Sequence, residues 1–390
     1  MEELKKNGVS PEQDVPEEEL SDEMKQKLKE LDKESNTVEY TGTWGRIIAI
    51  ICICFSLFQV YTGFFGVLDA MLQRAVHLSF GISLVYLLCP VKRSWIKGGS
   101  VHPLDLFLAI LSIIPPVYIL LNYQQLILRA GTVTPADTAI GLLGIVMVIE
   151  AARRIVGLPI VVVVLCFIAY GFFGPYMPGP LAHRGLSLQQ MVGHLFFTTE
   201  GVFGIPMGVS STFIFLFILF GAYLEKTGLG KFFIDIANAI AGWASGGPAK
   251  VAVLSSALEG TISGSSVANV VGSGAFTIPM MKKLGYSKNF AGAVEAAAST
   301  GGQIMPPVMG AAAFLMAEFV GIPYMEVVKA AVVPALLYFL GVFLGVHFEA
   351  KRENLKGTPR SLLPPFGRIL KEEGHLAIPL IAIIGLLSSG

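Results

Sequence analysis

The residues best placed to do chemistry lie in a polar segment of an otherwise very apolar chain. Residues 255–279 read SSALEGTISGSSVANVVGSGAFTIP, and apolar runs flank the centre of this segment at 249–254 and 275–281. A full membrane span needs roughly 20 mostly apolar residues, and each flank supplies only about half of that. The pattern therefore favours a re-entrant hairpin of two half-helices that enters the membrane and returns.

The turn of this predicted hairpin is rich in oxygen atoms. Irregular backbone survives at membrane depth only where protein or a water-filled cavity surrounds it, and half-helix ends then form ion or substrate sites. Hydroxyl and amide oxygens suit a hard cation such as Na⁺, and backbone N–H groups at the start of the second half-helix suit a carboxylate. The alternative is that the small residues only permit close helix packing. The predicted site residues in the turn are Ser263, Gly264, Ser265, Ser266 and Asn269.

A second interruption follows within what would otherwise be one long span. Residues 295–308 read EAAASTGGQIMPPV, with paired glycines and paired prolines. Proline removes amide donors and frees carbonyl oxygens, which can then face the hairpin turn; a simple kink is the alternative. Two broken elements in succession indicate the central site of a transporter. The predicted site residues here are Ser299, Thr300, Gly301, Gly302, Gln303, Pro306 and Pro307, and the predicted Na⁺ ligands are Ser263, Ser266, Asn269 and Gly302.

Acidic residues near the predicted membrane segments are a third candidate set, because buried carboxylates are costly and usually functional. Most of them fall near span ends, where an interfacial charge is the simpler interpretation. Glu259 and Glu295 are expected to lie deeper and are the candidate ionisable coupling residues.

The composition fixes the class of protein that must position these residues. The chain is 53% hydrophobic and 14% charged, whereas soluble domains carry roughly 25% charge. We therefore expect an all-α polytopic membrane protein. The zero net charge argues for neither a nucleic acid nor an anionic surface as partner. The four cysteines lie in apolar runs and are expected to be small buried residues, not metal or redox groups: Cys52, Cys54, Cys89 and Cys166.

No sequence motif of an enzyme is present. The chain contains no Walker A sequence, no H-E-x-x-H and no G-x-S-x-G elbow, so neither an ATPase nor a protease is indicated. We expect no catalytic residues and no organic cofactor.

Hydropathy predicts seven spans, at 46–66, 75–89, 104–121, 137–151, 158–175, 205–224 and 325–348. The pair Pro115-Pro116 is expected to kink the third span or end it early. Segments 188–203 and 230–243 are predicted to be short amphipathic helices, 290–320 a broken helix, and 349–373 a charged loop. The chain ends inside an apolar segment that starts near residue 376, so we expect it to belong to a longer protein.

Lys and Arg in short loops set the predicted orientation, with the N-terminus in the cytoplasm. Lys250 lies at the start of the hairpin, and Lys282, Lys283 and Lys288 lie at its end. Both ends of the hairpin are thereby placed on the cytoplasmic side, as a re-entrant element requires.

At the two broken elements the chain resembles the large membrane subunit of tripartite ATP-independent periplasmic (TRAP) transporters. The resemblance is strongest over 201–348, and the motifs that carry it are EGTISGSSVAN at 259–269, Gly272, IPMMKKLGY at 278–286 and GGQIMPP at 301–307. The four preceding spans resemble the small membrane subunit, joined in the same chain. One departure is Val308, where Ser often follows the two prolines in the unfused proteins.

The resemblance implies an elevator-type ion-transporter-like fold in a prokaryotic inner membrane. It implies a Na⁺-driven importer of organic acids that works with an extracytoplasmic solute-binding protein, and an inverted second half of the permease after the present end. It also implies a division of the chain into a cytoplasmic tail (1–40), a small-subunit-like scaffold (41–157), further scaffold (158–244), the first half of a transport domain (245–321), a scaffold span and loop (322–374) and an incomplete segment (375–390).

Two alternatives stay open at this point. One is a proton-coupled or binding-protein-independent carrier of related fold that uses Glu259 or Glu295. The other is a structural or assembly subunit of a larger membrane complex.

Overall fold

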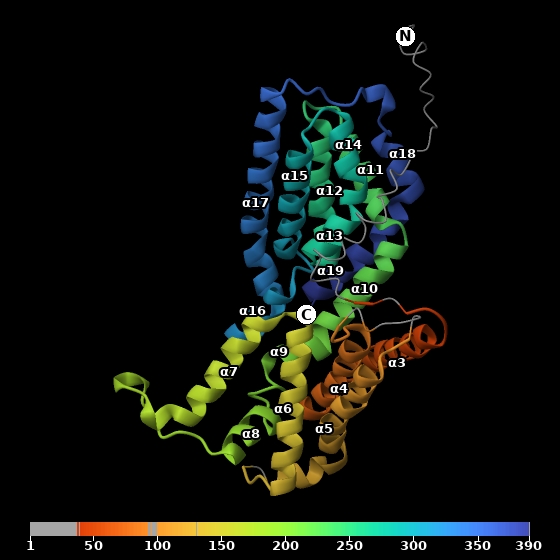
Figure 1. Cartoon of the computed structure of the whole chain (residues 1–390). Helices are drawn as coiled ribbons and strands as arrows, with labels where there is room; N and C mark the ends of the chain where they lie inside the picture. The colour runs from red at the N-terminus through yellow and green to blue at the C-terminus, as the bar shows by residue number, and fades with distance from the viewer. Residues whose placement is uncertain (1–36, 39, 93–94, 96–99, 130, 390) are drawn as a thin grey trace. The chain divides into compact units, whose positions relative to one another are not determined.

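The computed structural model describes residues 37–389 except 39, 93–94, 96–99 and 130, and every regular element among them is helical (Figure 1). Most of the predicted charged tail lies outside the described residues. Seven stretches of the described chain are long and apolar enough to cross a membrane. This confirms the all-α polytopic class and the seven predicted spans, which are α3 (Gly42–Phe65), α4 (Ala70–Leu88), α5 (Pro103–Leu128), α6 (Pro135–Ile155), α7 (Leu158–Phe173) with its 3₁₀ extension, α9 (Ile205–Val209) with α10 (Phe215–Lys226), and α17 (Tyr324–Arg352).

The prolines of the third predicted span do not end it. Helix α5 continues through Pro115 and Pro116 to Leu128, so the expectation of an early end is wrong. Both prolines are buried, and membrane helices tolerate internal proline because neighbouring helices and polar side chains re-satisfy the freed backbone groups.

The expectation of buried cysteines is also only partly met. Cys89 is buried, whereas Cys54 and Cys166 are exposed on α3 and α7. Large exposed apolar side chains surround them on the same helices, among them Ile53, Leu57 and Phe167. Surface of that composition is what a lipid-facing helix presents.

The chain divides into two compact units. The first contains Met1–Ile53 and Leu78–Phe197, and the second contains Cys54–His77 and Thr198–Gly390. Helices α3 and α4 therefore contribute residues to both units. The predicted division into scaffold and transport domains remains a prediction.

In the first unit, α6 packs against α5 and against α8 (Leu188–Phe197). A Cβ atom at Gly141 or Gly144 would collide with the side chains of Phe197 and Phe196. The two glycines therefore let α8 approach the backbone of α6, as small residues commonly do between membrane helices.

A buried ion pair ties three helices of the first unit together. Arg154 Nη1 donates to Asp105 Oδ1 at 2.7 Å and to the Cys89 carbonyl at 2.9 Å, and its guanidinium lies over the Tyr86 ring at 4.5 Å. The Arg154 and Asp105 side chains are 1% and 2% exposed. Glu150 accepts a further bond from Arg154 Nε at 3.0 Å, so the cation is surrounded by partners from α4, α5 and α6.

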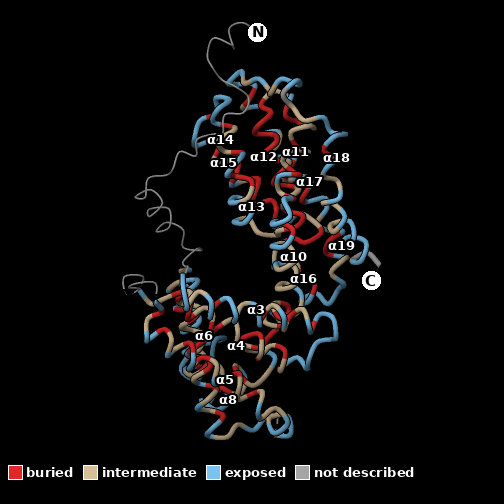
Figure 2. Tube along the Cα trace, turned by 90° about the vertical axis from the view of Figure 1, so that its right-hand side faces the viewer, coloured by how far each residue is buried: buried red, intermediate tan, exposed pale blue. Residues whose placement is uncertain are grey.

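The second unit is built around α12 (Gly247–Ser263), most of whose residues are buried (red in Figure 2). It packs against α11 (Leu229–Ala241), α14 (Gly274–Lys283), α15 (Lys288–Gly301) and α17. Small residues such as Ala249, Ala252 and Ala257 face this core, which allows four helices to surround a fifth closely.

The predicted charged loop at 349–373 is wrong in part. Helix α17 extends to Arg352, and α18 (Phe366–Glu373) forms before α19 (Ile378–Ser389). Ile369 of α18 is buried against Phe232 and Phe233 of α11. Phe366, Ile369 and Leu370 have the i, i+3, i+4 spacing of a narrow apolar stripe, which the surrounding charges obscure in the sequence.

We predict that Asp105→Asn lowers the free energy of unfolding by about 3 kcal/mol, because Arg154 stays buried without its main counter-charge. Denaturant titration in mixed micelles measures this. The matched control is Glu326→Gln, since Glu326 pairs with Lys329 in a pair whose side chains are 54% and 65% exposed and such pairs add little stability. If both substitutions lowered the free energy of unfolding equally, the buried pair would contribute no more stability than the exposed pair.

Candidate functional site

The hairpin turn forms because of two adjacent capping residues. Helix α12 ends at Ser263 and is capped by Gly264, whose φ of +55° is the left-handed conformation that glycine adopts without strain. The next residue, Ser265, caps α13 (Ser266–Gly272), with its hydroxyl accepting from the Ala268 N–H at 3.3 Å. A C-terminal glycine cap followed at once by a serine cap reverses the chain within two residues.

Asn269 joins the two arms of the hairpin. Ser263 Oγ donates to Asn269 Oδ1 at 2.5 Å, and Asn269 Nδ2 donates to the Ser256 carbonyl at 3.2 Å. Asn269 is only 1% exposed. Its amide therefore holds α13 against α12 and places a hydroxyl and an amide oxygen side by side at the tip.

The second broken element is also present. Helix α15 ends at Gly301, a 3₁₀ turn covers Gly302–Ile304, and helical structure resumes in α16 (Ala311–Val320). The Gly310 N–H donates to the Gln303 carbonyl at 2.7 Å across the gap, and the Val308 N–H donates to the Thr261 carbonyl of α12 at 3.4 Å. The break is thus supported by hydrogen bonds both within itself and to the hairpin.

Tyr324, which belongs to no motif in the sequence, organises the proline pair. Its hydroxyl lies 2.8 Å from the Pro307 carbonyl and 2.6 Å from the Val308 carbonyl. Its ring stacks on Phe314 of α16, with centroids 4.2 Å apart. The Tyr324 hydroxyl can donate to either of these carbonyls, one at a time, and so links α17 to the break.

The hairpin tip and the break lie in direct contact. A Cβ atom at Gly260 would collide with the backbone of Gly302, and one at Gly302 would lie 2.5 Å from Asn269 Nδ2. Gln303 Nε2 donates to Ser266 Oγ at 3.0 Å. Of the four predicted Na⁺ ligands, Ser263, Asn269 and Gly302 are thus neighbours, while the Ser266 side chain is bound to Gln303.

Two predicted site residues of α15 have hydroxyl groups that bond within their own helix. Thr300 is exposed, and its hydroxyl donates to the Ala296 carbonyl of its own helix at 2.7 Å. Ser299 is buried and donates to Glu295 Oε1 at 3.1 Å. Neither hydroxyl forms a hydrogen bond to the hairpin tip.

Glu295 is fully buried and lies among hydroxyl groups from three helical segments. Ser273 Oγ lies 2.6 Å and Ser256 Oγ 3.4 Å from Glu295 Oε1, and Thr277 donates to Glu295 Oε2. Ser273 Oγ also lies 2.8 Å from the Asn269 carbonyl, and Thr277 Oγ1 lies 3.0 Å from the Ser273 carbonyl. Hydrogen bonding to the anionic form is what makes a buried carboxylate tolerable.

The sequence did contain a signal for these hydroxyls. Asn269, Ser273 and Thr277 are spaced four residues apart, which places them on one face of a helix. The spacing runs through Ser273 because its backbone is helical, so α13 and α14 follow the same spiral across their boundary.

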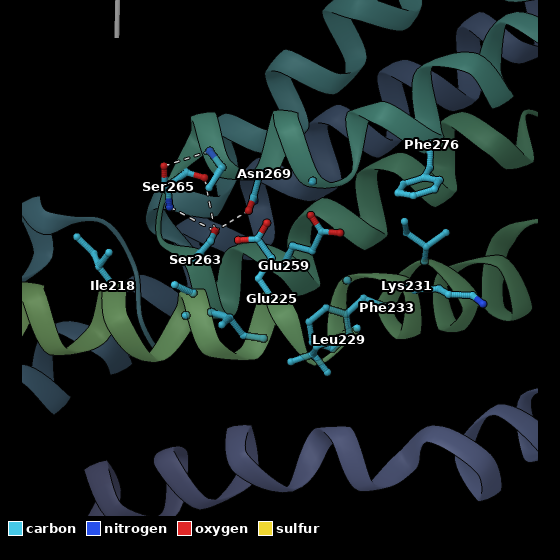
Figure 3. A pocket seen from close by; sticks show the side chains of 18 residues that line it. Ile218, Glu225, Leu229, Lys231, Phe233, Glu259, Ser263, Ser265, Asn269 and Phe276 are labelled. Atoms are coloured by element: carbon cyan, nitrogen blue, oxygen red, sulfur yellow. Dashed lines mark hydrogen bonds between the residues drawn. The ribbon is translucent and has the colours of Figure 1, made fainter. Parts of the chain in front are cut away.

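A cavity of about 440 Å³ lies on the side of the hairpin that faces α10 and α11 (Figure 3). Its lining includes Ser263, Ser265 and Asn269 of the tip, together with Glu259 of α12 and Glu225 of α10. The structure thus places Glu259 on a cavity wall and Glu295 inside the helix packing.

Comparison with known proteins gives a family for most of the chain. Residues 143–390 match the model of "Tripartite ATP-independent periplasmic transporter, DctM component". Among curated proteins, the chain is 35% identical over 143 residues to the C4-dicarboxylate TRAP transporter large permease protein DctM of Vibrio cholerae, which covers 37% of this chain and 31% of that protein.

Two further relatives extend the comparison. The DctM protein of Pseudomonas aeruginosa, named for the same function, is 30% identical over 174 residues, or 45% of this chain and 40% of that protein. The isethionate TRAP transporter permease protein DctMQ of Oleidesulfovibrio alaskensis is 27% identical over 172 residues, or 44% of this chain and 27% of that protein. The matches thus cover well under half of each relative's length.

We predict that Gly260→Ala destabilises the protein by about 1–3 kcal/mol, because the new methyl group has to displace the backbone of Gly302. The matched control is Gly292→Ala in α15, where a Cβ atom meets nothing within 4 Å and alanine favours the helix by about 0.5–1 kcal/mol. Thermal unfolding of both variants in the same detergent compares them. A Gly260→Ala variant at least as stable as Gly292→Ala would contradict the close contact.

Proposed function

Because this chain belongs to the DctM family of tripartite ATP-independent periplasmic transporters, we propose that it is the permease part of a Na⁺-coupled importer of organic acids. The family consists of transporter permeases, not enzymes, and the chain is a multi-pass protein of the bacterial inner membrane. The identities of the coupling ion, the solute and the partners are what we propose.

The observation that carries the proposal is the oxygen-rich contact between hairpin and broken helix. Ser263 Oγ and Asn269 Oδ1 are 2.5 Å apart, and the Ser265 carbonyl lies 3.5 Å from Ser263 Oγ. Hydroxyl, amide and carbonyl oxygens are the donors that hard cations prefer. The backbone of Gly302 lies in contact with Asn269. We therefore propose that Na⁺ binds where the hairpin tip meets the broken helix.

The relatives support an anionic solute. Two of them are named for C4-dicarboxylates and one for isethionate, which are small organic acids. Gln303 is exposed and lies within hydrogen-bonding distance of Ser266. We propose that these two side chains, at the open edge of the tip, contact the polar groups of the solute.

The proposed partners follow from the same family. An extracytoplasmic solute-binding protein would deliver the acid, and the remaining part of the permease would supply a second hairpin. The N-terminus would lie in the cytoplasm, and the hairpin with the broken helix would move as part of an elevator.

The test is solute uptake into proteoliposomes by the full-length permease, with and without its binding protein, under an imposed Na⁺ gradient. We expect uptake to require both. Ser263→Ala and Asn269→Ala should each raise the half-saturating Na⁺ concentration by about tenfold. Each substitution removes one ligand, whose contribution to binding is about that of one hydrogen bond.

Ser255→Ala is the matched control for these variants. Ser255 lies in the same helix and is fully buried, but its hydroxyl donates to the Ala252 carbonyl one turn away. Its Na⁺ dependence should equal that of the wild type. Uptake that persists without Na⁺ and follows pH would reject the Na⁺ coupling and make Glu259 and Glu295 the residues to test.

A further inference from the structure

We propose that the cavity between α10, α11 and the hairpin binds a small amphipathic organic cation, with an ammonium head group and a short apolar chain. This inference goes beyond the proposed transport function, because such a ligand has the opposite charge to the proposed solute.

The cavity has the size and the walls of a small-molecule site. Its volume of about 440 Å³ lies within the roughly 300–1,000 Å³ typical of ligand pockets. Apolar side chains from both sides form most of its walls: Ile218, Leu229, Phe233, Ile234, Ile262 and Phe276. A ligand that fills this space therefore needs an apolar part.

Two carboxylates give the cavity its charge preference. Glu225 lines it from α10 and Glu259 from α12. Among the residues that the structure describes, the ion pairs lie elsewhere and involve Arg129, Arg153, Arg154, Lys329, Arg352 and Arg368. Carboxylate groups beside apolar walls favour a cationic ligand over an anionic one.

The basic side chain in the lining does not neutralise this charge. Lys231 of α11 lines the far end of the cavity, and Figure 3 shows its ammonium group directed away from Glu259. The other titratable groups on the helices that line the cavity are not part of its lining: Tyr223 and Lys226 on α10, Asp235 on α11, Lys250 on α12, and Lys282 and Lys283 on α14.

Two glycines flank the Glu259 carboxylate. A Cβ atom at Gly230 would lie 3.5 Å from Glu259 Oε1, and one at Gly272 would lie 3.4 Å from Glu259 Oε2. Both distances are ordinary van der Waals contacts, so only glycine backbone flanks the two oxygens on these sides. Ser263 and Asn269, which hydrogen-bond to each other, lie near Glu259 in the cavity lining (Figure 3).

The experiment uses the full-length permease in detergent, without Na⁺, solute or binding protein. Three probes share one chain length: hexyltrimethylammonium, hexanol and hexanoate. We expect saturable binding of the ammonium probe by calorimetry and no saturable binding of the alcohol or the carboxylate.

Variants locate the site. Glu259→Gln and Glu225→Gln should each weaken binding of the ammonium probe by about tenfold, because each removes a carboxylate that can pair with the ammonium group. Ala222→Phe, which fills the cavity from α10 but leaves both carboxylates, should abolish it. Glu326→Gln, an exposed carboxylate on α17, is the control and should bind as the wild type does. Thermal unfolding of each variant confirms folding.

Three results would overturn the proposal. Equal binding of hexanol and the ammonium probe would show apolar partitioning only. Preferred binding of hexanoate would make the cavity a site for anions. Unchanged binding in all three cavity variants would place the cation elsewhere. None of these measurements depends on Na⁺-driven uptake, which is assayed separately, so failure here is distinguishable from failure of the transport proposal.

Discussion

The second unit depends on one constraint: a chain that leaves helical geometry among apolar helices has to satisfy its polar backbone groups within the protein. Two breaks meet this requirement in different ways. At the hairpin tip, Gly264 and Ser265 provide caps, and the Asn269 side chain binds a Ser256 carbonyl. At the second break, the Tyr324 hydroxyl lies within hydrogen-bonding distance of the Pro307 carbonyl, and the Gln303 carbonyl accepts from the Gly310 N–H. These bonds replace those that a continuous helix would have formed. Each break thus relies on a neighbouring element for its shape.

Close backbone contact makes the two breaks one structure. Gly260 and Gly302 touch without intervening side chains, and α12 and α15 share the apolar cluster around Ala252, Val294 and Ala298. In the first unit a buried ion pair connects the helices instead. Its cation, Arg154, is surrounded by Asp105, Glu150 and the Tyr86 ring. In both units buried polar groups connect different helices.

Much of this could be predicted from the sequence, because hydropathy and interrupted apolar runs are local signals. The seven spans, the turn at 263–266 and the break after Gly301 are of this kind. The course of α5 beyond Pro116 could not be predicted, since it depends on neighbours that bury the prolines. Helix α18 was missed because three apolar residues among charges look like a loop until α11 offers them a surface. The positions of Ser299 and Thr300 depend on helix rotation, and the partner role of Tyr324 on tertiary contact alone.

Two hydroxyl groups around Glu295 each have two possible acceptors for their single proton. Each hydroxyl carries one proton, yet Ser273 Oγ lies within reach of both the Asn269 carbonyl and Glu295 Oε1, and Thr277 Oγ1 lies within reach of both the Ser273 carbonyl and Glu295 Oε2. Only one acceptor of each pair can be served at a time. The Ser273 hydroxyl thus connects the Glu295 carboxylate to the carbonyl of Asn269, and a rotation of its O–H bond exchanges one acceptor for the other. Such a rotation alters the local dipoles while the oxygen atoms of the helical framework keep their places.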